Sequence, residues 1–88
     1  MPVKEEFEIL LERLKIERDK LNLKMHLASM EVKEEFGEAE KKWVHVKQKA
    51  AEFADDTKDV SEELVDKAKI VGEELKEAYS RINKRLSK

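Results

Sequence analysis

The 88-residue chain contains no cysteine, one proline and two glycines. Without cysteine it has neither disulfides nor thiolate metal ligands. A β-rich fold needs many turns, and with so few proline and glycine residues such a fold is not expected. No apolar run approaches the roughly 20 residues that span a bilayer. The N-terminal residues also lack the apolar segment of a secretory signal, so we expect a cytoplasmic protein.

Charged residues are abundant, but neither sign is concentrated in one region. They make up 45% of the chain, and 19 basic against 21 acidic side chains leave a formal net charge of −2. No patch suited to a polyanion is visible, so no nucleic-acid partner is predicted. Many Glu, Lys, Leu and Ala residues with few turn formers are typical of long helices. The composition predicts an all-α fold, with residues 1–88 forming a single helical coiled-coil domain that needs a partner because so short a chain buries little surface.

An apolar stripe with helical spacing begins near the N-terminus. Its members recur in steps of three and four residues from Phe7 to Phe53, as in an amphipathic helix. Pro2 suits the first turn of such a helix, since its missing N–H would be unpaired there. A short run of four-residue steps and the isolated Gly37 bend this pattern without ending it. We therefore predict one long helix over about 4–54.

A stronger break follows at residues 55–59, which read Asp-Asp-Thr-Lys-Asp. Aspartate is a poor helix former and a good N-cap, and Asp59 with Glu62 has the spacing of a capping box. A second apolar stripe then runs over about 60–86 and ends in basic residues that suit the negative end of a helix dipole. A turn at 55–59 would make the chain a two-helix antiparallel hairpin. Because the two stripes stay nearly in phase through Thr57, one continuous long helix in a coiled coil is the alternative.

The two helices of this hairpin would share an apolar seam. The predicted seam residues are Val32, Phe36, Trp43, Val46, Phe53, Val60, Leu64, Val71, Leu75, Tyr79 and Ile82. At a rise of 1.5 Å per residue the first helix would be about 75 Å long and the second about 40 Å. The residues before about Met25 would therefore project beyond the shorter helix.

This projecting segment is apolar on two faces. Ile9, Ile16, Leu23 and Met30 recur at every seventh residue on the side opposite the main stripe. A helix with two apolar faces needs neighbours on both, which predicts self-association. The predicted oligomer interface consists of Phe7, Ile9, Leu14, Ile16, Leu21, Leu23, Leu27 and Met30. We expect a two-fold dimer whose projecting ends pack antiparallel in a four-helix-bundle cross-section, or a tetramer.

Few residues in the sequence point to chemistry. On one continuous helix His26 and His45 would lie about 30 Å apart, too far to share an ion. No Glu-x-x-His pair is present, and the paired glutamates fall on polar faces rather than in a dry cleft. The hydroxyl residues have no histidine at a helical spacing that would activate them. We therefore expect no enzymatic activity, no catalytic residues, and neither a cofactor nor a metal site.

These observations favour a non-enzymatic structural or adaptor protein, a homo-oligomeric helical bundle that mediates protein–protein interaction. The first alternative is an amphipathic, apolipoprotein-like or stress-related protein that acts at lipid surfaces, although such helices usually carry an excess of basic residues. The second alternative is a metal or small-ligand carrier, based on His26 with Met25 and Met30, which could suit a soft ion.

Two stretches, 33–43 and 59–79, resemble small uncharacterised bacterial coiled-coil proteins. The first reads Lys-Glu-Glu-Phe-Gly-Glu-Ala-Glu-Lys-Lys-Trp, and the second begins Asp-Val-Ser-Glu-Glu-Leu and ends Lys-Glu-Ala-Tyr. The chain is also similar, more loosely, to apolipoprotein-like and late-embryogenesis-like helical repeats. The resemblance implies helical assembly, and it transfers no functional residue and no activity.

Overall fold

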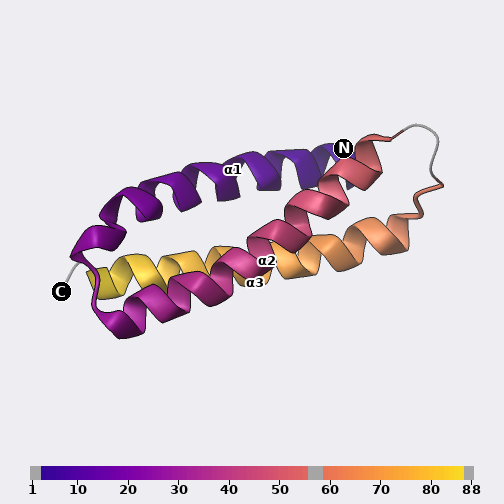
Figure 1. Cartoon of the computed structure of the whole chain (residues 1–88). Helices are drawn as coiled ribbons and strands as arrows, with labels where there is room; N and C mark the ends of the chain where they lie inside the picture. The colour runs from indigo at the N-terminus through magenta and orange to yellow at the C-terminus, as the bar shows by residue number, and fades with distance from the viewer. Residues whose placement is uncertain (1–2, 56–58, 87–88) are drawn as a thin grey trace.

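A computed structural model describes residues 3–55 and 59–86 of the chain. In this part of the chain the elements are α1 (Val3–Lys24), the short 3-10 helix η1 (Met25–Leu27), α2 (Met30–Ala54) and α3 (Glu62–Leu86). The prediction of an all-α fold is confirmed. Figure 1 shows that the three α-helices lie side by side, with α2 running antiparallel to α1 and α3. The bundle measures 44 × 21 × 18 Å.

The chain turns back between α1 and α2, so the prediction of one helix over about 4–54 is wrong. After η1, Ala28 and Ser29 adopt extended backbone conformations. The Ser29 side-chain oxygen then accepts a hydrogen bond from the backbone N–H of Val32 at 3.3 Å, which caps α2. The turn lets the apolar stripe of α1 pack against α2 and α3 of the same chain. The fold is therefore a three-helix bundle rather than a two-helix hairpin, and no part of residues 3–55 and 59–86 forms the long projecting segment expected from the sequence.

A second reversal separates α2 from α3, as the sequence predicts, and the alternative of one continuous helix is wrong. Of the predicted turn at 55–59, residues 56–58 lie outside the described residues. Helix α3 begins at Glu62 and extends to Leu86, close to the predicted range of about 60–86. Its N-terminus is capped by Ser61, whose hydroxyl oxygen accepts from the Leu64 N–H at 3.3 Å. The cap expected at Asp59 therefore lies two residues later.

The apolar stripes of the three helices meet in one core. The rings of Phe7 and Phe53 make an edge-to-face contact at 5.3 Å between centroids, which joins the start of α1 to the end of α2. Among the largest fully buried side chains are Leu14 and Leu21 from α1, Val46 from α2, and Val65, Leu75, Tyr79 and Ile82 from α3. The core therefore draws its side chains from the full length of each helix.

Helices α1 and α3 approach each other closely at Gly72. A Cβ atom at this position would lie 2.8 Å from Leu10 Cδ2, closer than ordinary van der Waals contact. Leu14 Cδ1 would lie 3.6 Å from the same Cβ atom. Because Gly72 has no side chain, there is room for both leucines at this contact between the helices. Gly37, within α2, has nothing within 4 Å of where its Cβ would be. Packing therefore requires a glycine at position 72 and does not require one at position 37.

Ion pairs connect each pair of helices. Glu6 and Lys69 join α1 to α3 at 3.0 Å, and Arg18 and Glu40 join α1 to α2 at 2.7 Å. Lys42 and Glu74 join α2 to α3 at 3.5 Å. Arg85 of α3 also pairs with Glu31 and Glu35 of α2. Pairs of this kind at a surface each contribute at most about 1 kcal/mol. Their main effect is to favour one register of the helices over others.

Candidate interaction surface

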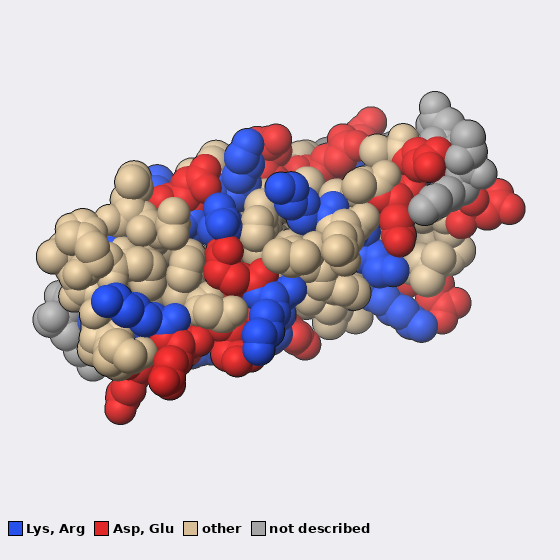
Figure 2. All heavy atoms as spheres, viewed as in Figure 1, with Lys and Arg blue, Asp and Glu red and all other residues tan. Residues whose placement is uncertain are grey.

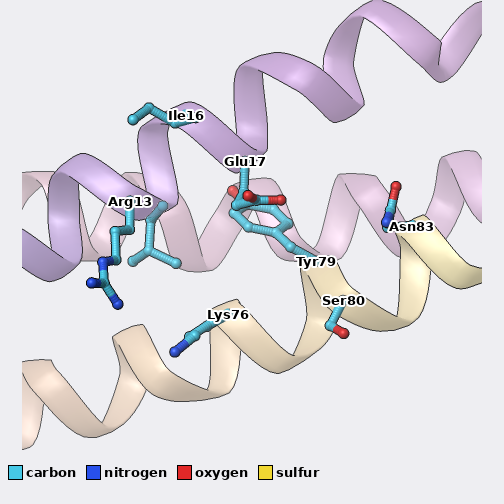
Figure 3. A pocket seen from close by; sticks show the side chains of 8 residues that line it. Arg13, Ile16, Glu17, Lys76, Tyr79, Ser80 and Asn83 are labelled. Atoms are coloured by element: carbon cyan, nitrogen blue, oxygen red, sulfur yellow. The ribbon is translucent and has the colours of Figure 1, made fainter.

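The outward side of α1 carries three large aliphatic side chains. Ile9, Ile16 and Leu23 are 45%, 51% and 75% exposed, although their types are typical of a protein interior. They recur at every seventh residue, so on a helix they form one line along the axis. Figure 3 shows Ile16 projecting from α1 away from α3. We call Ile9, Ile16 and Leu23 the outer row.

Two more exposed hydrophobic residues follow where α1 turns into α2. Leu27 belongs to η1 and Met30 begins α2, and they are 76% and 72% exposed. The extended backbone at Ala28 and Ser29 interrupts the helix between these two hydrophobic residues, and neither side chain points into the core. We call Leu27 and Met30 the turn pair. The outer row and the turn pair together make up five of the eight residues in the predicted oligomer interface.

The other three residues of that predicted interface have a different role. Phe7, Leu14 and Leu21 are each 1% exposed and lie in the core of the single chain. The prediction that they lie at an oligomer interface is wrong, because the turn at Ser29 brings α2 and α3 against this face of α1. A partner is therefore not needed to bury them.

Charged residues border the outer row on both sides. At 100° per residue, Glu5, Glu12 and Asp19 lie on one side of the row, and Arg13 and Lys20 lie on the other. All five are exposed. Asp19 contacts Arg18 at 3.4 Å, whereas the other four form no salt bridge within residues 3–55 and 59–86. We call these two sets the acidic edge and the basic edge.

Arg13 of the basic edge faces a groove between α1 and α3. The groove has a volume of about 510 Å³, and its walls include Arg13, Ile16 and Glu17 from α1 with Lys76, Tyr79 and Ser80 from α3. Figure 3 shows the Arg13 side chain extending from α1 toward α3, with Lys76 at the same end of the groove. Two cationic side chains thus lie across the groove from one another.

The rest of the visible surface has no comparable order. Figure 2 shows Lys and Arg interspersed with Asp and Glu over the face that it presents. Further exposed hydrophobic residues are Val44 on α2 and Leu64 and Ile70 on α3. Single exposed hydrophobic residues of this kind are common on protein surfaces. The line of three on α1 is distinguished by its regular spacing.

Most of the predicted seam residues lie in the core. This core also contains residues of α1, so it joins three helices rather than two. The buried members are Val32, Phe36, Trp43, Val46, Phe53, Leu75, Tyr79 and Ile82. Val60 and Val71 are partly buried against this core. Leu64 is 48% exposed, and its predicted place is taken by Val65. Because α3 begins at Glu62, its inward stripe starts at Val65 instead of continuing from Val60.

A polar cluster near the middle of the bundle had no counterpart in the sequence predictions. Arg18 donates from Nε and one Nη to the two carboxylate oxygens of Glu40, at 2.7 and 2.8 Å. The guanidinium also lies 5.8 Å from the ring centroid of Trp43, within the range of a cation–π contact. Because the two residues of the ion pair are far apart in sequence, helical spacing gave no signal for it. The cluster ties α1 to α2.

Tyr79 is the one core side chain whose polar atom is left without a partner in the described part of the chain. Its hydroxyl is buried and makes no hydrogen bond there. Burial raises the pKa of Tyr79 above its usual value, and the carboxylate of Glu40 raises it further. The ring packs 6.4 Å from that of Phe36, so the residue acts mainly as an apolar filler.

The histidines lie apart and on the surface. His26, in η1, donates a hydrogen bond from Nδ1 to the Leu23 carbonyl oxygen at 2.9 Å, and His45 lies exposed on α2. Within the described residues, no three His, Asp or Glu side chains are grouped so that they could hold a metal ion. In the same residues, no helix is long and apolar enough to cross a membrane.

Comparisons with protein-family models, with curated proteins and with solved structures found no match for this chain.

Proposed function

We propose that this chain is a non-enzymatic structural or adaptor protein that self-associates, and mediates protein–protein interaction, through the outer row and the turn pair. The observation that carries the proposal is the regular line of Ile9, Ile16 and Leu23 on the outward side of α1. Burying a side chain of this size stabilises an association by roughly 1.5–3 kcal/mol. The five residues of the two sets therefore supply a substantial drive to associate.

The contrast between the buried inward face and the exposed outward face of α1 supports this proposal. Its inward stripe, with Phe7, Leu14 and Leu21, already stabilises the single chain. Leucine and isoleucine on the outward side do not contribute to that core, so the fold of one chain gives no reason for their presence. Contact with another protein does give one, because a partner would remove them from water.

A lipid surface fits the same residues less well. Membrane-surface helices present a broad apolar face bordered by basic residues. Here the broad apolar faces of the helices face one another, and one border of the outer row is formed by Glu5, Glu12 and Asp19. Anionic lipids would repel that border. Vesicles of anionic lipid are nevertheless a direct check, and co-sedimentation of the chain with them would favour the lipid alternative.

The proposal is tested by light scattering and sedimentation equilibrium over a range of concentrations. We expect wild-type protein to form a discrete oligomer and the double variant Ile16→Asp with Leu23→Asp to be monomeric. Because both side chains are exposed, circular dichroism of the variant should show unchanged helix content.

The matched control is Val44→Asp with Ile70→Asp, which places the same charges at exposed hydrophobic positions on α2 and α3. This variant should associate as the wild type does. A wild-type chain that stays monomeric at all concentrations would overturn the proposal. So would a double variant on α1 that associates as well as the control.

A further inference from the structure

We propose that the partner of the outer row is a second copy of this chain, with the two α1 helices packed parallel and in register. The inference rests on the proposed function, since it names the partner and its orientation at the same surface. It replaces the antiparallel arrangement expected from the sequence. Three features of α1 and its surroundings support it.

The first feature is the position of the two charged edges. When two copies pack row against row about a two-fold axis parallel to the helices, the acidic edge of each lies beside the basic edge of the other. When they pack antiparallel, the two-fold axis is perpendicular to the helices, and each edge lies beside its own copy. Opposite charges therefore meet only in the parallel arrangement.

The heights of these residues along the helix axis show which charged side chains of the two copies would meet in each arrangement. Adjacent residues differ in height by 1.5 Å, so in a parallel pair in register Glu12 lies within about 1.5 Å of the height of Arg13 in the second copy. Asp19 stands in the same relation to Lys20. In an antiparallel pair centred on Ile16, Glu12 would instead lie within about 1.5 Å of the height of Asp19 on the same side of the other copy, and Arg13 would stand in the same relation to Lys20.

The second feature is the uneven exposure of the hydrophobic residues. Leu23, Leu27 and Met30 are each more than 70% exposed, whereas Ile9 and Ile16 are about half exposed. The most exposed residues thus gather at the end of α1 where the chain turns. A parallel pair brings the two turn ends together, whereas an antiparallel pair would set each of them beside the acidic N-terminal turns of the other copy.

The third feature is the groove between α1 and α3. Arg13 and Lys76 line the same groove from opposite sides, and neither forms a salt bridge within the described residues. In the parallel arrangement the acidic edge of the second copy lies on this side of the row. Its carboxylates would then add negative charge beside Arg13 and Lys76, in addition to that of Glu17 of the same chain.

The orientation can be read from disulfides, because the wild-type chain contains no cysteine. A disulfide requires Cα atoms about 4.4–6.8 Å apart, and Ile9 and Leu23 are separated by about 21 Å along the helix. We would prepare Ile9→Cys and Leu23→Cys, one of them isotope-labelled, and mix them at equilibrium in a glutathione buffer. We expect each variant to link to itself, with these homodisulfides exceeding the mixed disulfide about tenfold.

Two further variants serve as controls. Ile16→Cys lies at the centre of the row and should link to itself in either orientation. Lys41→Cys, whose position on α2 is well exposed and distant from the row in sequence, gives the background of random collision.

A predominance of the mixed disulfide over the homodisulfides would overturn the parallel arrangement and leave the proposed function standing. Background levels at positions 9, 16 and 23 in a chain that is oligomeric by light scattering would overturn the row as the contact. A monomeric wild-type chain would overturn this inference together with the proposed function.

Discussion

The inward and outward faces of α1 carry similar side chains in different surroundings. On the inward face Phe7, Leu10, Leu14 and Leu21 are almost fully buried, whereas Ile9, Ile16 and Leu23 on the outward face are about half exposed or more. Hydropathy alone does not separate the two faces, because both consist of large apolar residues with helical spacing. What separates them is the turn at Ser29, which brings α2 and α3 against one face only. The inward face therefore stabilises the single chain, whereas the outward face remains in contact with water.

The largest expected difference between the faces is in the free energy of unfolding. Leu14→Ala would leave a cavity in the core and should lower the free energy of unfolding by about 2–5 kcal/mol. Ile16→Ala, two residues away, should change the stability of the single chain by less than about 0.5 kcal/mol. Urea unfolding of both variants, measured at a concentration where the chain is monomeric, tests this. Equal losses would mean that the outward face is buried in the monomer.

The sequence predicted the helices well where the signals were local. The stripes over α2 and α3, the reversal between them and the burial of residues such as Trp43, Leu75 and Ile82 follow from helical spacing and from a cluster of poor helix formers. The same reasoning identified the exposed line of Ile9, Ile16 and Leu23 as unusual. Spacing within one chain does not tell what would cover this line, because that depends on contacts outside the helix.

The turn at 25–29 was missed because it has no proline or glycine. The available signal was Ser29, a good N-cap, followed closely by Glu31 at a position that suits the positive end of a helix dipole. The irregular steps near Val32 are consistent with the stripe changing helices there. Once that turn was missed, Phe7, Leu14 and Leu21 had no partner within the chain and were assigned to an oligomer. Tertiary contacts, including the one between Arg18 and Glu40, cannot be deduced from local pattern alone.

The inward face of α1 can be probed from the opposite helix. Gly72→Val would place atoms where Leu10 and Leu14 pack, and overpacking of this kind should lower the free energy of unfolding by about 1–3 kcal/mol. Gly37→Val is the matched control, since the space beside Gly37 is open and the change in helix propensity is less than about 0.5 kcal/mol. Thermal unfolding of the two variants compares them directly. A loss at Gly37 as large as that at Gly72 would contradict the close approach of α1 to α3.

A smaller effect is expected at Tyr79, which also packs near the inward face of α1. Removing its unpaired buried hydroxyl in Tyr79→Phe should raise the free energy of unfolding by about 1 kcal/mol at neutral pH. The folded state raises the pKa of this phenol, whereas the unfolded chain releases the proton near pH 10. Above about pH 10 the wild type should therefore lose stability as the pH rises, by up to about 1.4 kcal/mol per pH unit, through this group.

Comparing the two proteins by urea unfolding at several pH values isolates the contribution of Tyr79, because the lysines that also titrate in this range are common to both. The difference in stability between Tyr79→Phe and the wild type should widen above about pH 10. A constant difference would mean that the hydroxyl reaches solvent in the folded state.

The smallest expected effect concerns the charged edges of the outward face. If the acidic edge of one copy lies beside the basic edge of the other, added salt screens an attraction, since the Debye length falls from about 30 Å at 0.01 M to about 10 Å at 0.1 M. The dissociation constant of the oligomer should therefore rise several-fold between these two concentrations of sodium chloride. An antiparallel pair would place like charges together and would respond in the opposite direction, with tighter association as salt is added. Sedimentation equilibrium of Glu12→Gln with Asp19→Asn supplies the control, because neutralising the acidic edge should remove most of the salt dependence while the hydrophobic contacts of Ile9, Ile16 and Leu23 remain.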